Sequence, residues 1–214
     1  MDANDVAQFL KANPQFFDQH PQLLESIYVP HPHGGRAIPL TERQIVSLRE
    51  KVRLLEAKLG EFVRFGEDND AIGEKVHRLS LALLGAKDFA STAHALYFHL
   101  REDFAVPHVA LRVWGKSLLD GTLEGSPVEA GLRDKAETMG APQCGPAAGN
   151  AFLPWFREAE EHIRSVALVP LGQTRTIGLL ALGSEDPKRF FSEMGTLYLR
   201  RIGELTAGAL AART

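Results

Sequence analysis

Two apolar runs separated by a short polar connector constrain this chain more than any other feature. They span residues 165–171 and 177–184, and Gly172 opens the connector between them. This pattern predicts two strands joined as a hairpin. Because the runs barely alternate polar and apolar residues, both faces of the sheet are expected to be covered. A layered fold of sheet and helices follows.

The overall composition limits the classes of protein to consider. The chain has 214 residues, of which 44% are hydrophobic and 24% charged, as in soluble globular proteins. Its net charge of -3 argues against a large nucleic-acid footprint. The single cysteine, Cys144, allows no internal disulfide and favours a reducing, cytoplasmic location. The N-terminus lacks the basic segment of a secretory signal, and no apolar run is long enough to span a membrane.

Residues 1–40 are predicted to form a helical arm followed by a loop. Three apolar pairs recur at seven-residue intervals, and prolines precede the second and third pairs. Each proline suits the first position of a short helix, which is not stable alone in water. The pairs therefore pack within the protein or against a partner. The candidate partner-binding residues are Phe16, Phe17, Leu23 and Leu24.

Three histidines of the arm and loop raise the question of a metal site. His31 and His33 lie in a Pro/Gly-rich loop, and His20 lies upstream. No cysteine or dense acidic cluster joins them, so no metal site is expected.

A heptad seam predicts a long helix from Thr41 to about Ala86. Apolar residues recur at alternating spacings of three and four, with charged residues between them. The seam consists of Ile45, Leu48, Val52, Leu55, Leu59 and Phe62. A helix with one apolar stripe needs a partner, and residues 41–74 are predicted to form a parallel homodimeric coiled coil. The alternative is that the stripe packs on the globular part of the same chain.

The seam changes phase after Phe62. Two consecutive three-residue steps, from Leu59 to Phe62 to Phe65, form a stammer. The repeat then resumes through Asn69, Ile72, Val76, Leu79 and Leu83.

Residues 75–214 are predicted to form a single globular domain. Asp88 can cap a helix over residues 89–103, and residues 106–114 have the pattern of a strand. Arg112 lies in the middle of this strand on an apolar background. It therefore either forms an ion pair at a sheet edge or lines a cavity and binds an anion.

The rest of the domain is predicted from shorter signals. A capping box at Ser126 predicts a helix that runs to about residue 139. Residues 141–146, which include Cys144, are predicted to form a loop. A last helix is predicted over residues 192–212, and small residues such as Gly203 would let another helix approach it closely.

The order of these elements resembles a GAF domain, a relative of the PAS sensor fold. The motifs that carry the resemblance are Ser165-Val-Ala-Leu-Val-Pro-Leu, Ile177-Gly-Leu-Leu-Ala-Leu-Gly-Ser and Asp186 to Phe190. The arm, the Pro32-His33-Gly34-Gly35 loop and Cys144-Gly145 are similar to a bacterial, GAF-like group, domain-of-unknown-function family 484. The resemblance implies an α+β fold: a GAF-like, PAS-related antiparallel sheet flanked by helices, preceded by a long coiled-coil helix and a short helical arm. It implies a cytosolic bacterial protein and confers no activity.

Catalytic motifs are absent from the sequence. It contains no Gly-x-Ser-x-Gly elbow, no Walker loop and no Gly-x-Gly-x-x-Gly. Cys144 is the only candidate nucleophile, and free cysteines commonly behave as small buried hydrophobes. The chain is therefore not expected to be an enzyme, and no catalytic residue is assigned.

Two functions remain as hypotheses. The first is a regulatory module that binds a small molecule and signals through the coiled coil to a separate protein, with an unknown cofactor. Its candidate ligand-binding residues are Arg112, Trp114, Cys144, Phe152 and Trp155. The alternative is an adaptor dimer that binds no ligand and docks a partner through its arm.

Overall fold

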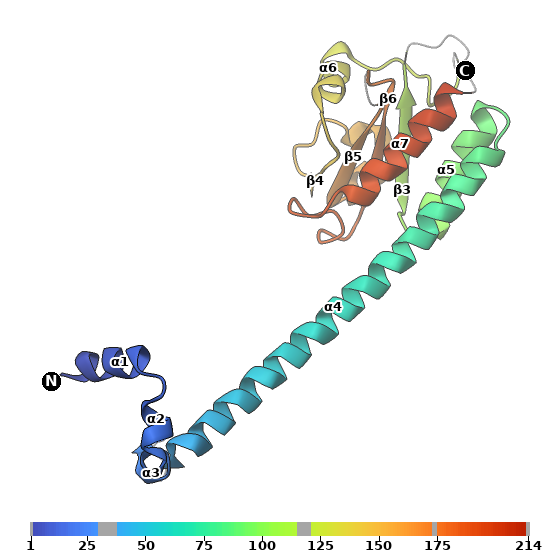
Figure 1. Cartoon of the computed structure of the whole chain (residues 1–214). Helices are drawn as coiled ribbons and strands as arrows, with labels where there is room; N and C mark the ends of the chain where they lie inside the picture. The colour runs from blue at the N-terminus through green and yellow to red at the C-terminus, as the bar shows by residue number, and fades with distance from the viewer. Residues whose placement is uncertain (1, 30–37, 115–120, 173–174, 213–214) are drawn as a thin grey trace. The chain divides into compact units, whose positions relative to one another are not determined.

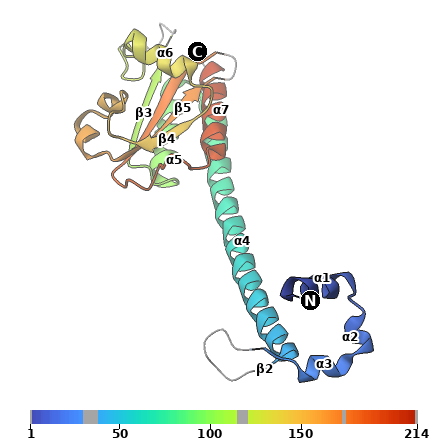
Figure 2. The ribbon, with the colours of Figure 1, turned by 90° about the vertical axis from the view of Figure 1, so that its left-hand side faces the viewer.

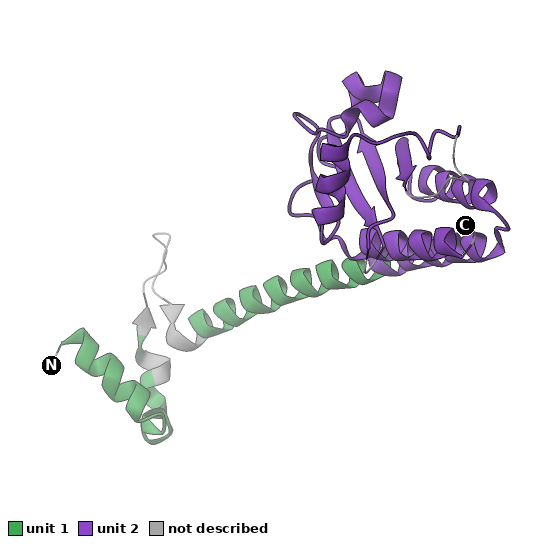
Figure 3. Cartoon of the chain, turned by 90° about the horizontal axis from the view of Figure 1, so that it is seen from above, with its two compact units in different colours: residues 1–67 green, residues 68–214 purple. Residues whose placement is uncertain are grey.

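The computed structural model describes residues 2–29, 38–114, 121–172 and 175–212. The chain divides into two compact units, residues 1–67 and 68–214 (Figure 3). One helix, α4 (Leu40–Gly85), begins in the first unit and ends in the second. The predicted long helix is thus confirmed.

The first unit contains the predicted short helices. Its elements before α4 are α1 (Ala3–Ala12), α2 (Phe16–Gln19), α3 (Pro21–Ser26), β1 (Tyr28–Val29) and β2 (Ile38–Pro39). The Asp2 carboxylate caps α1 by accepting hydrogen bonds from the N–H groups of Asn4 and Asp5. Pro21 occupies the first turn of α3, as predicted. The predicted loop with His31 and His33 lies outside the described residues.

The second unit is built on a four-stranded antiparallel sheet with the strand order β3-β6-β5-β4 (Figure 1). Its strands are β3 (His108–Val113), β4 (Gln143–Pro146), β5 (Ser165–Leu171) and β6 (Gly178–Ser184). The predicted hairpin is confirmed, because β5 and β6 pair along their whole length, from Ser165↔Ser184 to Leu171↔Gly178. Every residue of β6 is buried, since β6 lies between two other strands.

Helices cover both faces of this sheet, as predicted (Figure 2). One face, which includes Leu111 and Leu180, packs against the end of α4, α5 (Phe89–Glu102) and α7 (Leu197–Ala211). The other face, which includes Ala110 and Ala181, packs against α6 (Ala130–Thr138) and η2 (Leu153–His162). We call these the α7 face and the η2 face. The predicted α+β class, with an antiparallel sheet flanked by helices, is therefore confirmed.

Two local predictions are wrong. The predicted loop at residues 141–146 contains strand β4, because pairing with β5 overrides the local preference of a Pro/Gly-rich segment. Ser126 does not cap α6, which begins at Ala130 after an extended Glu129. The Ser126 hydroxyl instead donates a hydrogen bond to the Thr122 carbonyl oxygen.

Gly203 on α7 has a different neighbour from the one predicted. A Cβ atom at Gly203 would lie 2.7 Å from Cγ1 of Val169. Gly203 therefore lets α7 approach strand β5 rather than another helix.

Candidate functional site

Arg112 is the most unusual residue of the η2 face. It lies on the edge strand β3, opposite Leu179, and is only 6% exposed. Its Nη1 donates a 2.8 Å hydrogen bond to the Leu111 carbonyl oxygen. Its Cζ lies 5.3 Å from the centroid of the Trp155 ring, within the range of a cation–π contact. Among the described residues, the guanidinium is thus held by one backbone oxygen and one aromatic ring.

The charge of Arg112 is poorly compensated. No carboxylate of the described residues forms an ion pair with it. Burial lowers the pKa of Arg112; Tyr97 and Glu124 oppose that shift, while the positive charge of Arg157 adds to it. A guanidinium carries five N–H donors, so most of its hydrogen-bonding capacity is open to a ligand.

Glu124 is the carboxylate whose negative charge acts on Arg112, and it is hydrogen-bonded to Tyr97. The Tyr97 hydroxyl donates a 2.9 Å hydrogen bond to Oε1 of Glu124. Burial first, and then this carboxylate, raise the pKa of Tyr97 far above its ordinary value. The phenol therefore stays protonated and keeps the carboxylate as its acceptor.

Aromatic side chains surround Arg112 on the same face of the sheet. The rings of Phe152 and Trp155 meet edge to face, with centroids 5.1 Å apart. The Trp114 Nε1 donates to the Thr176 carbonyl oxygen at 3.1 Å. Trp114, Phe152 and Trp155 all belong to the cluster on the η2 face. The structure thus brings four of the five predicted ligand-binding residues to one side of the sheet.

A cavity of about 350 Å³ lies beside Phe152. Its polar lining includes Lys135, Gln143 and Asn150. The Asn150 Oδ1 accepts a 3.0 Å hydrogen bond from the Phe152 N–H, which fixes this side chain at the edge of the cavity. The volume is at the small end of the range for ligand sites.

Cys144 lies apart from the other predicted ligand-binding residues. It is half-buried on β4 and packs on the α7 face. Burial raises the pKa of its thiol, which keeps the thiol protonated near neutral pH. This environment suits a structural cysteine.

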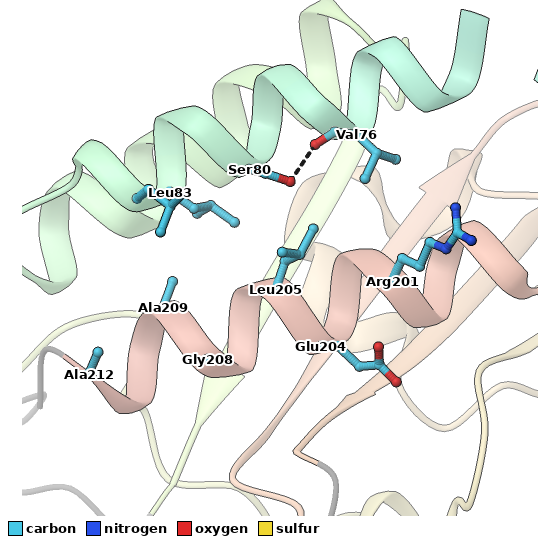
Figure 4. A pocket seen from close by; sticks show the side chains of 10 residues that line it. Val76, Ser80, Leu83, Arg201, Glu204, Leu205, Gly208, Ala209 and Ala212 are labelled. Carbon is cyan, nitrogen blue, oxygen red and sulfur yellow. Dashed lines mark hydrogen bonds between the residues drawn. The ribbon is translucent and has the colours of Figure 1, made fainter. Parts of the chain in front are cut away.

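A groove of about 550 Å³ runs between α4 and α7 in the second unit (Figure 4). Val76 and Leu83 line it from α4, and Leu205 and Ala209 point toward α4 from α7. The Ser80 hydroxyl donates to the Val76 carbonyl oxygen at 2.8 Å and is satisfied within its own helix. The groove therefore offers an apolar shape with few polar groups to orient a ligand.

The motif at residues 184–190 is structural. The Ser165 hydroxyl donates to the Asp186 carbonyl oxygen at 2.7 Å and accepts a hydrogen bond from the Phe190 N–H at 3.3 Å. Arg189 donates to the Phe104 carbonyl oxygen. These bonds fix the turn that follows β6.

The predicted dimer-interface residues lie on α4 in the first unit. They are Ile45, Leu48, Val52, Leu55, Leu59 and Phe62, and all are 49–70% exposed. Described residues of the chain thus leave this seam uncovered. No helix among the described residues has the length and apolar character needed to cross a membrane.

The predicted partner-binding residues of the arm partly pack on each other. The Phe16 ring lies 5.4 Å from Phe17 and 4.9 Å from His20, between centroids. Leu23 is half-buried, and the side chain of Leu24 lies outside the described part of the structure. Phe9 touches Phe16 and remains about half-exposed.

Metal ligands do not gather in the described ranges. Across residues 2–29, 38–114, 121–172 and 175–212, no three His, Cys, Asp or Glu side chains are placed to hold a metal ion.

Several residues of the site carry no signal in the sequence. Tyr97 and Glu124 are 27 positions apart, so only the fold shows that they meet. Lys135 and Asn150 look like ordinary surface residues. Arg157 has an unusual backbone, with φ of 55°, which its residue type does not predict.

Comparison with known families decides where the chain belongs. The sequence profile described as "Protein of unknown function, DUF484" matches residues 1–212. The chain belongs to the DUF484 family. Among curated bacterial proteins, this DUF484 chain is similar to two called "Uncharacterized protein YigA". The Salmonella typhimurium LT2 protein is 24% identical over 213 residues, which cover 94% of this chain and 88% of the relative. The Escherichia coli K12 protein is 24% identical over 209 residues, with the same coverage.

Two solved structures similar to this DUF484 chain are GAF domains. The GAF domain of A. aeolicus nlh2 has a TM-score of 0.49 and 16% identity, and the match covers 68% of this chain and 99% of that domain. A GAF domain from Pseudomonas syringae pv. tomato has a TM-score of 0.45 and 16% identity, and the match covers 70% of this chain and 92% of that domain.

Proposed function

We propose that this DUF484 chain is a regulatory module without enzymatic activity. It binds a small molecule with an anionic group on the η2 face of its sheet. It forms a homodimer through α4 and signals to a separate protein. The single cysteine and the resemblance to a bacterial GAF-like group support a cytoplasmic setting.

Buried Arg112 is the observation that carries this proposal. A buried charge is costly unless an opposite charge and hydrogen bonds compensate it. In the described part of the chain, Arg112 has one hydrogen-bond acceptor and one ring as partners, and Glu124 accepts a hydrogen bond from Tyr97. A carboxylate or phosphate would match the fork of guanidinium donors. Trp155 would then form the wall on which the ligand packs.

The test is native mass spectrometry of the full chain purified from its own host. We expect a constant extra mass on the wild-type protein, and its loss in Arg112→Met. Arg200→Met is the matched control, because Arg200 is exposed on α7. The proposed ligand site would be rejected by two results together. The wild-type protein would carry no extra mass, and no metabolite with a carboxylate or phosphate group would raise its melting temperature.

Retention of the mass in Arg112→Met would remove Arg112 from the site. Arg112→Lys separates charge from geometry, since lysine keeps the charge without the planar fork. We expect this variant to retain a small part of the binding.

An adaptor function is the second candidate, and the exposed rings of the arm favour it. Val6 and Phe9 are both exposed on α1, and the Phe9 ring contacts the Phe16 ring. In this function the arm binds another protein and the η2 face stays filled. Cross-linked pull-downs with Phe9→Ala, Phe16→Ala and Leu23→Ala test it, with Lys11→Ala as the exposed control. An unchanged set of captured proteins in all variants would reject the adaptor.

A further inference from the structure

We infer that α4 forms a parallel, in-register, two-stranded coiled coil with a second copy of this chain, in which Lys51 of each copy pairs with Glu56 of the other. The inference rests on the proposed dimer. It adds the register of the helices and the charged residues that select the parallel orientation predicted from the sequence.

The exposed surface of α4 calls for a second helix. Ten large apolar side chains between Ile45 and Phe65 are 49–70% exposed. Six of them form the seam from Ile45 to Phe62, and an exposed apolar stripe of this kind marks an interface in a stable protein. The spacing places β-branched Ile45 and Val52 at a positions and Leu48 and Leu55 at d positions. Parallel dimers favour this combination.

The flanking charges fit a parallel pair. Lys51 occupies a g position and Glu56 the following e position, and a parallel in-register dimer brings these positions of opposite chains together twice. The other facing pairs contain no like charges: Gln44 with Arg49, and Lys58 with Val63. Within one chain, the ion pair between Arg53 and Glu50 lies at b and f positions, away from the seam. Neither Lys51 nor Glu56 forms an ion pair with a described residue, so both are open to a second copy.

An antiparallel pair fits these charges less well. With full overlap of the seams, it places Lys51 beside Lys58 of the second copy twice, both times on the side where g positions face each other. The attraction between Arg49 and Glu56, which the same arrangement allows, is offset by this repulsion. The parallel pair gains an attraction without a matching repulsion.

Charge reversal tests the pairing by sedimentation equilibrium of the full chain. Lys51→Glu and Glu56→Lys each turn two attractions into repulsions, so each is expected to raise the dimer Kd about tenfold. A 1:1 mixture of the two variants is expected to recover wild-type affinity as a heterodimer. Glu50→Lys, away from the seam, is the matched control and should change the Kd little. Tighter dimerisation of Lys51→Glu would overturn the parallel pairing, because it would relieve the contact with Lys58.

Disulfide cross-linking tests the orientation independently. In a Cys144→Ser background, Ile45→Cys should cross-link to itself on oxidation. An antiparallel dimer would separate the two copies of position 45 by about 25 Å, at 1.5 Å per residue. Cross-linking of Ile45→Cys only with Phe62→Cys would overturn the orientation and leave the proposed dimer standing. A monomeric wild-type chain would overturn both.

Discussion

The upstream and downstream parts of α4 carry the same heptad repeat but differ in what covers it. The seam from Ile45 to Phe62 is 49–70% exposed, whereas Val76, Leu79 and Leu83 are 0–9% exposed. The downstream residues belong to the core on the α7 face. The repeat shows that a helix needs a partner, and tertiary structure decides which partner it has.

The phase shift between Leu59 and Phe65 falls between these two parts. A stammer turns the apolar stripe around the helix axis. One helix can therefore form a coiled coil in its upstream part and pack against the globular part of the same chain in its downstream part. Packing against the globular part is confirmed for Val76, Leu79 and Leu83, and the coiled coil remains the proposal for the upstream part.

The largest expected effect comes from Leu79→Ala. Leu79 is completely buried, so its truncation should lower the free energy of unfolding of the second unit by about 2–5 kcal/mol. Tryptophan fluorescence during urea unfolding measures this, because both tryptophans, Trp114 and Trp155, lie in the second unit.

Leu55→Ala is the matched control on the upstream part of the same helix. It should leave the tryptophan transition of a dilute sample unchanged and weaken self-association. Equal destabilisation of the second unit by the two variants would break the contrast between the two parts of α4.

The layer that covers the downstream part can be disturbed without a change in α4. Gly203→Ala would place a methyl group against Val169 on β5, at a cost of about 1–3 kcal/mol through displacement of α7. The same fluorescence transition reports it. Gly208→Ala is the control, since no atom lies within 4 Å of a Cβ there. Equal stability of the two variants would show that α7 shifts freely on the sheet.

A smaller effect is expected where α4 is tied to α5. Asp103 accepts a hydrogen bond from Arg78 Nη2 at 2.8 Å, and its other oxygen lies 2.6 Å from Nδ1 of His99. Asp103→Asn should lower the melting temperature by about 2–4 °C. Glu102→Gln, an exposed neighbour, should leave it unchanged.

The effect of Asp103→Asn should also depend on pH. Arg78, and then His99, lower the pKa of Asp103 in the folded chain. The stabilisation is therefore complete above the ordinary aspartate pKa of about 4 and is lost as the pH falls through the lowered value. Melting curves of the two proteins should converge on acidification below that range. A difference that grows in acid would contradict this assignment.

The smallest effect is expected between the two parts of α4. The Tyr198 hydroxyl donates a 3.0 Å hydrogen bond to the Asn69 carbonyl oxygen. Tyr198→Phe removes only this bond and should cost about 0.5 kcal/mol. Hydrogen exchange should then rise around Asn69 and stay constant around Leu79. A uniform rise along α4 would show that the two parts open together.

Local periodicity predicted most of the fold. The sequence predicted three elements because each pattern spans one continuous segment. They are the hairpin of β5 and β6, the long helix and the helix capped by Asp88. Strand β4 was not readable, since its pairing with β5 comes from a segment more than 15 residues away. Gly145 and Pro146 locally resemble a loop.

The candidate site was predictable only in part. Arg112 stood out as a charge within an apolar strand, and alternation placed it on the same face as Trp114. The engagement of Glu124 by Tyr97 depends on the packing of α5 against the edge of the sheet. The place of Cys144 on the opposite face depended on strand β4, which the sequence did not predict.

The absence of a side chain at Gly183 has a consequence for how family members vary. A Cβ atom there would lie 2.7 Å from Cδ1 of Ile163 and 3.2 Å from the Phe156 ring. Gly183 on β6 therefore leaves the space in which η2 packs on the sheet. These positions should covary in the family. Natural relatives with a larger residue in place of Gly183 should have a smaller residue in place of Ile163 or Phe156.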